Sequence, residues 1–246
     1  MNEISARILV VDDEADACAN LADILGDLGY GVDTACDGYR ALELVRHTAY
    51  DVAFLDLRMP EMDGLTLYRE LKQLSPQTVA VIVTAYGNHE TAALAQKAGA
   101  WKVLPKPVDL PAMLQLVEQA TRQPLVLVVD DDDALCLSLQ DLLQDRGYRV
   151  GIAHSQSQLL HRLQQRDYQV LLLDVRLPDG GSLETLQRAR SLDPELPVVL
   201  MTGLGAERGP EVAQLLAAGA DAVCYKPFDM EYLLTTLQRL SLQSLS

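Results

Sequence analysis

The sequence predicts two α/β domains in tandem, each a five-stranded parallel sheet covered by helices on both faces. The first observation is a repeat, because polar residues that follow apolar runs recur 118 residues later, at 12 and 130, 56 and 174, and 84 and 202. The second is that these runs are apolar throughout, which is typical of strands buried on both faces. The third is that helical patterns separate them, as in parallel sheets with helical crossovers.

The first repeat supplies five strands and five helices in alternation. Short apolar runs bounded by polar or turn residues predict the strands, and longer amphipathic patterns predict the helices. Strands are expected near 7–11, 32–35, 52–55, 79–83 and 102–104. Helices are expected near 14–27, 38–47, 64–74, 89–98 and 109–121.

The second repeat follows the same order. Its strands are expected near 125–129, 149–153, 170–173, 197–201 and 222–224. Pro124 cannot continue the helix before it and separates the two units. We therefore expect domain 1 at 1–121, a short linker at 122–124 and domain 2 at 125–246. A repeat of this length describes whole domains, because solenoid units span only about 20–50 residues.

Composition excludes several classes of function. The net charge of −15 divides evenly, because residues 1–123 hold 10 Lys plus Arg against 18 Asp plus Glu, and the remainder holds 10 against 17. Nucleic-acid backbones call for clustered positive charge, so we expect no direct binding of nucleic acid. No apolar run approaches the roughly 20 residues that span a bilayer. The chain is therefore expected to be cytoplasmic and free of membrane contact.

The cysteines indicate neither a metal site nor a disulfide. They show no paired Cys-x-x-Cys spacing, and Cys18 and Cys136 occupy equivalent helical positions in the two repeats. All four are interpreted as small buried hydrophobic residues in a reducing compartment. The remaining two are Cys36 and Cys224.

Polar residues end the strands that would border a ligand crevice. In the flavodoxin-like strand order 2-1-3-4-5, ligands collect beyond the carboxyl ends of strands 1 and 3. Asp12 and Asp13 end strand 1, and Asp56 ends strand 3. Thr84 and Lys106 end strands 4 and 5 on the same rim. The equivalent residues of the second repeat are Asp130, Asp131, Asp174, Thr202 and Lys226.

This set of residues suits a phosphoryl group. Three neighbouring carboxylates repel one another, and a divalent cation or a raised pKa resolves the repulsion. Oxygen ligands favour Mg²⁺ or Mn²⁺, so we expect one such ion in each domain. A lysine and a threonine add a second cation and a hydroxyl donor for phosphoryl oxygens. One carboxylate can then be the nucleophile of an in-line transfer.

Each residue also has a structural interpretation when it is taken alone. Asp12 and Asp13 could cap the first helix, Asp56 could start a turn, and the Thr and Lys could be ordinary strand-end and surface residues. The fixed spacing argues against all of these at once. Each repeat has 43 residues from its second Asp to the third and 28 more to the Thr. The second half also has nine arginines and a single lysine, Lys226.

The ordered set resembles the receiver domain of two-component response regulators, once in each half. The matching segments of the first half are Val10–Glu14, Leu55–Gly64, Val83–Ala85, Ala98–Ala100 and Lys106–Pro107. Those of the second half are Val128–Asp132, Leu173–Gly180, Met201–Gly203, Ala218–Asp221 and Lys226–Phe228.

The resemblance implies a role for each residue. Asp56 and Asp174 would be phosphoacceptors for a histidine kinase or a histidine phosphotransfer protein. They would also take part in binding Mg²⁺, which Asp13 and Asp131 would bind directly and Asp12 and Asp130 through water. Two backbone carbonyls would complete the metal sites, those of Arg58 and Arg176. The phosphoryl oxygens would be held by Thr84, Lys106, Thr202 and Lys226. Each Lys-Pro bond resembles a site where the family often has a cis peptide.

Two departures from the family pattern concern how phosphorylation is signalled and how long the acyl phosphate lasts. Val103 and Val223 stand where the family usually has a Tyr or Phe that changes orientation on phosphorylation. Arg58 and Arg176 stand two residues after the phosphoacceptors, with Tyr86 and Leu204 two after each Thr. We hypothesise that these long side chains hinder water and prolong the acyl phosphate, the alternative being that both arginines are merely solvated. Trp101 could mark a partner surface or simply pack at the domain edge.

The expected function is that of a tandem receiver response regulator. It would signal through protein contacts, with homodimerisation possible, without a DNA-binding output domain and without enzymatic activity beyond its own phosphorylation and dephosphorylation. One alternative is the receiver portion of a longer hybrid kinase or diguanylate cyclase, and another is a degenerate receiver pair. A haloacid-dehalogenase type phosphatase is a remote alternative, because Arg58 and Arg176 replace the acid of its Asp-x-Asp motif.

Overall fold

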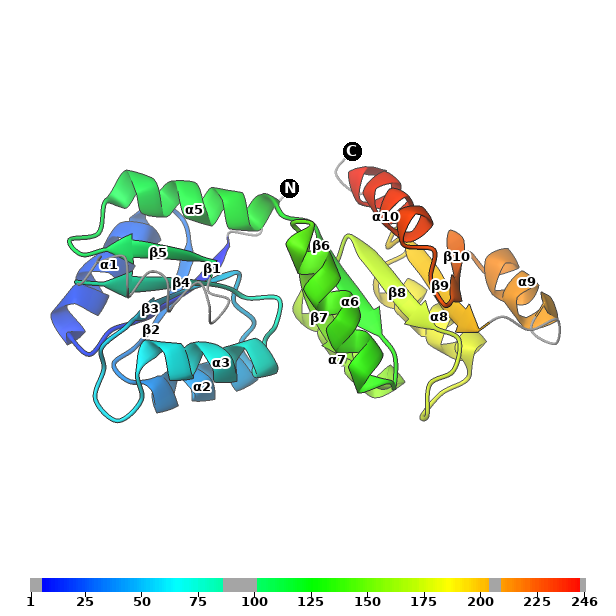
Figure 1. Cartoon of the computed structure of the whole chain (residues 1–246), viewed down its shortest axis with the longest axis horizontal. Helices are drawn as coiled ribbons and strands as arrows, with labels where there is room; N and C mark the ends of the chain where they lie inside the picture. The colour runs from blue at the N-terminus through cyan, green and yellow to red at the C-terminus, as the bar shows by residue number, and fades with distance from the viewer. Residues whose placement is uncertain (1–5, 86–100, 204–208, 244–246) are drawn as a thin grey trace. The chain divides into compact units, whose positions relative to one another are not determined.

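The chain divides into two compact units, Met1–Gln123 and Pro124–Ser246. The computed structural model describes residues 6–85, 101–203 and 209–243 (Figure 1). The expected helix near 89–98 and the segment Ala98–Ala100 lie outside the described residues, as do Tyr86 and Leu204. In the described part of the chain, no helix is long and apolar enough to cross a membrane.

Domain 1 is the expected parallel α/β fold, with strand order β2-β1-β3-β4-β5. Strand bounds agree with the sequence pattern to within a residue, and α5 ends one residue later than expected. Its elements are β1 (Arg7–Val11), α1 (Ala15–Asp27), β2 (Gly31–Ala35), α2 (Gly38–His47), β3 (Val52–Asp56), α3 (Gly64–Leu74), β4 (Val79–Thr84), β5 (Lys102–Pro105) and α5 (Leu110–Arg122).

Domain 2 repeats this architecture with strand order β7-β6-β8-β9-β10. The fold class predicted from the sequence is therefore confirmed for both halves. Its elements are β6 (Leu125–Val129), α6 (Asp133–Asp145), β7 (Arg149–Ala153), α7 (Gln156–Gln165), β8 (Val170–Asp174), α8 (Ser182–Leu192), β9 (Val198–Gly203), α9 (Gly209–Ala217), β10 (Ala222–Lys226) and α10 (Met230–Gln243).

Each sheet has a hydrophobic core on both faces. In β1, Leu9 and Val11 face the core under α2 and α3, whereas Ile8 and Val10 face the core under α1 and α5 (Figure 1). In domain 2, α7, α8 and α9 cover one face, and α6 and α10 cover the other. Alternating side chains of a strand point to opposite faces, so burial on both sides requires the continuous apolar runs of the sequence.

The strand register brings the polar strand ends together. Val11 pairs with Leu55, so the residues that follow them, Asp12 and Asp56, lie side by side at the carboxyl ends of β1 and β3. Thr84 pairs with Pro105, which places Lys106 at the same rim. The second sheet has the same arrangement, because Val129 pairs with Leu173 and Tyr225 with Thr202.

Cys36 and Trp101 test two expectations drawn from the sequence, one on cysteine burial and one on the role of the tryptophan. Cys36 is exposed, so the prediction that all four cysteines are buried is wrong at this position. The reason is that Cys36 follows the last residue of β2 and lies beyond the covered part of the sheet. Trp101 packs partly buried against the core between the sheet, α1 and α5, which supports edge packing within the domain.

We expect Gly64→Ala to destabilise domain 1. A Cβ atom at Gly64 would lie 2.2 Å from the backbone oxygen of Asp56 and 3.0 Å from the Leu57 Cα, so the backbone would have to shift. Overpacking of this kind costs about 1–3 kcal/mol. Denaturant unfolding followed by the fluorescence of Trp101, the single tryptophan, would report domain 1.

Gly26→Ala is the matched control for this experiment. Apart from the neighbouring backbone of its own helix, no atom lies within 4 Å of a Cβ built at Gly26 in α1, so the unfolding midpoint should stay the same or rise. Equal midpoints for Gly64→Ala and the parent chain would contradict the predicted steric conflict.

Candidate functional site

In domain 1, the Lys106 ammonium lies between two carboxylates at the rim of the sheet. Its Nζ is 2.6 Å from Asp12 Oδ2 and 2.8 Å from Asp56 Oδ1. Asp12 and Asp56 are only 7% and 6% exposed, so water screens the ion pairs poorly. The three elements β1, β3 and β5 therefore converge on one charged group of side chains.

Backbone N–H groups hold the other carboxylate oxygens. The N–H of Glu14 donates to Asp12 Oδ1 at 3.1 Å, and the N–H of Arg58 donates to Asp56 Oδ2 at 2.8 Å. The backbone of Lys106 is also fixed, because its N–H donates to the Thr84 carbonyl at 2.8 Å. The Lys106–Pro107 peptide is cis, as the family resemblance implied.

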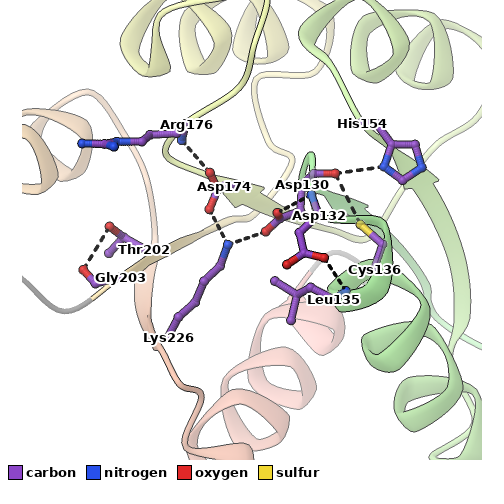
Figure 2. Close-up of polar contacts among 10 residues, drawn as sticks. All are labelled: Asp130, Asp132, Leu135, Cys136, His154, Asp174, Arg176, Thr202, Gly203 and Lys226. Atoms are coloured by element: carbon purple, nitrogen blue, oxygen red, sulfur yellow. Dashed lines mark hydrogen bonds and ion pairs between the residues drawn. The ribbon is translucent and has the colours of Figure 1, made fainter.

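Domain 2 contains the same arrangement with nearly the same distances. Figure 2 shows Lys226 reaching between Asp130 and Asp174, with Nζ 2.5 Å from Asp130 Oδ2 and 2.6 Å from Asp174 Oδ1. The N–H of Arg176 donates to Asp174 Oδ2 at 2.7 Å, and the N–H of Asp132 donates to Asp130 Oδ1 at 3.1 Å. The Lys226–Pro227 peptide is also cis.

Burial and the carboxylate partners have opposite effects on the pKa of each lysine. Burial disfavours the ammonium of Lys106, yet hydrogen bonds to Asp12 and Asp56 outweigh it and raise the pKa of the lysine. Lys226 has a raised pKa for the same reason, through Asp130 and Asp174. Burial also raises the pKa of Asp174, although the hydrogen bond from Lys226 works against that rise.

The other predicted site residues lie at the same rim in different environments. Thr84 and Thr202 are buried at 1% and 0% exposure, and the Thr202 hydroxyl donates to the Gly203 carbonyl at 3.5 Å. Asp13 and Asp131 are exposed beside their buried neighbours. The Arg58 and Arg176 side chains are exposed as well. Figure 2 shows the Arg176 side chain extending away from Lys226.

The residues present fit a divalent cation, although they do not form a complete cage. Within the described residues, no three acid, histidine or cysteine side chains are grouped as a metal site. Each domain instead offers two buried carboxylates against one ammonium, which leaves an excess negative charge. In domain 1, a Mg²⁺ ion that keeps several waters could be held by Asp12, the exposed Asp13, Asp56 and the Arg58 carbonyl. The equivalent residues of domain 2 are Asp130, the exposed Asp131, Asp174 and the Arg176 carbonyl.

The structure adds contacts that sequence reasoning missed. His154 Nδ1 lies 3.0 Å from the Asp130 carbonyl oxygen, and because a carbonyl can only accept, the ring nitrogen donates (Figure 2). The Cys18 and Cys136 thiols donate to the equivalent carbonyls of Asp12 and Asp130, at 3.4 and 3.5 Å. The sequence held signs of these contacts, because His154 directly follows an expected strand and the two cysteines occupy equivalent positions of the repeat. Asp132 was also missed, and its side chain caps α6 at the N–H of Leu135.

The comparison with known proteins identifies the same unit in each half. The model of the response regulator receiver domain family matches residues 8–118 and again residues 126–238. A solved receiver domain protein from Methanospirillum hungatei has 26% identity and a TM-score of 0.45, with 48% of this chain and 98% of that chain covered.

Two curated relatives differ in how much of their length is matched. A response regulator receiver protein of Anaeromyxobacter sp. is 37% identical over 234 residues, which cover 95% of this chain and 94% of that protein. The transcriptional regulatory protein ZraR of Escherichia coli is 42% identical over 120 residues, which cover 49% of this chain but only 27% of ZraR. The chain belongs to the response regulator receiver domain family of two-component systems, with one receiver domain in each half.

Proposed function

We propose that both domains accept phosphoryl groups, on Asp56 and Asp174, from a histidine kinase or a histidine phosphotransfer protein. The observation that carries this proposal is the lysine ammonium within 2.8 Å of the acceptor carboxylate in each domain. A positive charge held there can stabilise the phosphoryl oxygens as charge develops during transfer.

The transfer is a displacement at phosphorus. A carboxylate oxygen of Asp56 or Asp174 forms the new P–O bond while the P–N bond to the donor imidazole breaks, and the leaving nitrogen takes up a proton. Lys106 or Lys226 remains paired with an oxygen of the acceptor or of the phosphoryl group. The hydroxyl of Thr84 or Thr202 is the candidate donor to an equatorial oxygen. A Mg²⁺ or Mn²⁺ ion, one in each domain, would add charge neutralisation when bound.

The chain then acts as a phosphorylation-dependent protein-binding regulator and not as an enzyme with a separate substrate. The net charge of −15 supports partners other than nucleic acid, and we infer a cytoplasmic location. Signalling through protein contacts agrees with the Anaeromyxobacter receiver protein, because nearly all of its length aligns with these two domains. A homodimer is one form that such contacts could take.

We expect the parent chain to take up a phosphoryl group in each domain, because both domains have the lysine and both carboxylates. Asp56→Asn should prevent modification of domain 1 alone, and Asp174→Asn that of domain 2 alone. Intact mass after incubation with acetyl phosphate and Mg²⁺ would count the groups, with the double variant as the unmodified control. Modification confined to one domain of the parent chain would contradict the proposal for the other.

We expect Arg58→Ala and Arg176→Ala to shorten the lifetime of the acyl phosphate in their own domains severalfold. The reason is that a long side chain at this position can fold over the phosphoryl group and hinder water. Loss of phosphorylated species after donor removal would measure the lifetime. Arg40→Ala is the control, because Arg40 is an exposed arginine that pairs with Glu43 on α2. Unchanged lifetimes in both variants would contradict a role of these arginines in hindering water.

We expect Asp174→Asn to gain stability relative to the parent as the pH rises from 4 to 7 in the absence of divalent cations. The folded-state pKa of Asp174 is raised, so its contribution to stability is present below the unfolded pKa of about 4 and is lost as the pH rises through the folded value. The asparagine cannot ionise and avoids this loss.

Circular dichroism would follow the unfolding of domain 2, with Trp101 fluorescence identifying the transition of domain 1. Glu231→Gln removes an exposed carboxylate from α10 and controls for the loss of one negative charge. If the free energies of unfolding of Asp174→Asn and the parent differ by the same amount at every pH, the raised pKa of Asp174 is contradicted.

A further inference from the structure

A single carboxylate fastens the loop that follows the domain 2 phosphoacceptor to a neighbouring helix. Residues 175–181 connect β8 to α8. Asp179 Oδ1 accepts from the Gln156 N–H at 2.6 Å, and Oδ2 accepts from the N–H and hydroxyl of Ser157 at 3.1 and 2.9 Å. These donors belong to the first turn of α7, where the helix dipole also favours a negative charge. The N–H of Ser157 and the other donors lower the pKa of Asp179, so it is ionised at neutral pH.

The next residue of the loop also rests on α7. A Cβ atom at Gly180 would lie 2.7 Å from Gln156 Cδ, so only glycine fits this approach. Gln156 is 4% exposed and cannot move aside easily, because its Nε2 donates to Thr185 Oγ1 at 3.1 Å and its Oε1 accepts from Arg188 at 3.2 Å. The loop is therefore held by hydrogen bonds to a charged carboxylate and by a steric contact at adjacent residues.

These contacts restrict the backbone at Arg176 from both sides. On one side, the Arg176 N–H donates to Asp174 Oδ2 at 2.7 Å. On the other, Leu177 and Gly180 form an antiparallel bridge that closes the turn containing Asp179. We propose that Asp179 is a positioning residue for divalent-cation binding in domain 2, because it holds the loop that carries the Arg176 carbonyl against α7. This inference rests on the proposed function.

Domain 1 holds the equivalent loop by different means. Glu61 stands 118 residues before Asp179, but it is exposed and has a φ of 65°. The loop is instead seated by Met62, which is 8% exposed, against Gly38, where a Cβ atom would lie 2.6 Å from the methionine sulfur. An apolar contact thus replaces the hydrogen bonds to the carboxylate, and by the same inference cation binding in domain 1 does not depend on Glu61.

The test is Mn²⁺ binding to the 246-residue chain, measured through the electron paramagnetic resonance signal of the free ion. In an Asp12→Asn background, which weakens the domain 1 site, Asp179→Ala should raise the Mn²⁺ dissociation constant of domain 2 about 10- to 100-fold, the usual cost of losing a contact that orients a metal ligand. Ser157→Ala removes one donor without changing the loop and should act in the same direction by less. In an Asp130→Asn background, Glu61→Ala should leave Mn²⁺ binding to domain 1 unchanged.

Hydrogen exchange adds a readout that needs no metal. Asp179→Ala should speed amide exchange in residues 175–181 of the metal-free chain, whereas Glu61→Ala should leave the loop of domain 1 as it is. A folded Asp179→Ala chain with the parental Mn²⁺ affinity would overturn this inference. It would also be overturned if Glu61→Ala weakened Mn²⁺ binding to domain 1 as much as Asp179→Ala weakened binding to domain 2.

The remaining outcomes are also decisive. If Asp179→Ala does not fold, a folded Ser157→Ala chain with unchanged Mn²⁺ affinity would overturn the inference by itself. A parent chain that binds no Mn²⁺ in either domain would remove the cation from the proposed function and this inference with it. If the parent chain binds Mn²⁺ and Asp179→Ala leaves that binding unchanged, the role of Asp179 is overturned but the proposed function is not.

Discussion

Each domain depends on one lysine ammonium that is shared by two buried carboxylates. Two carboxylates at the ends of neighbouring strands would repel each other, and burial would raise that cost because water cannot screen them. Lys106 and Lys226 relieve the repulsion from a third strand end, at distances of 2.5–2.8 Å. The excess negative charge that remains suits a cation, and the same ammonium suits a phosphoryl group. The interactions that stabilise these strand ends therefore also suit the proposed chemistry.

The two copies share this interaction but differ in what surrounds it. In domain 2, His154 donates to the Asp130 carbonyl, whereas the equivalent position in domain 1 is the exposed Cys36. The loop after β8 is held by Asp179 in domain 2, and the loop after β3 is held by Met62 in domain 1. The hydrogen bonds to Asp179 require an ionised carboxylate, whereas the packing of Met62 against Gly38 involves no charge. The two domains thus share the ammonium between two carboxylates while differing in the contacts that hold the loop beside it.

The absence of the family's usual aromatic residue leaves the readout to other parts of each domain. Val103 and Val223 are partly buried and pack against the cores under the sheet. A valine at this position cannot alternate between a buried and an exposed ring. In domain 2, the Ser182 hydroxyl donates to Glu211 at 2.8 Å, which connects the start of α8, directly after the 175–181 loop, to α9. Movement of that loop would reach α9 through this contact without an aromatic switch.

The sequence by itself determined the architecture and the rim on which the site lies. Continuous apolar runs predict buried parallel strands, and parallel strands bring their carboxyl ends to one edge, so Asp12, Asp56 and Lys106 could be expected to meet. The tertiary structure decided which of the paired acids is buried and which is exposed, that His154 reaches Asp130, and that Asp179 anchors its loop. The physical reason is that side-chain direction alternates predictably only within a strand. Beyond the strand end, it depends on loop conformation and on contacts with helices that lie far away in the sequence.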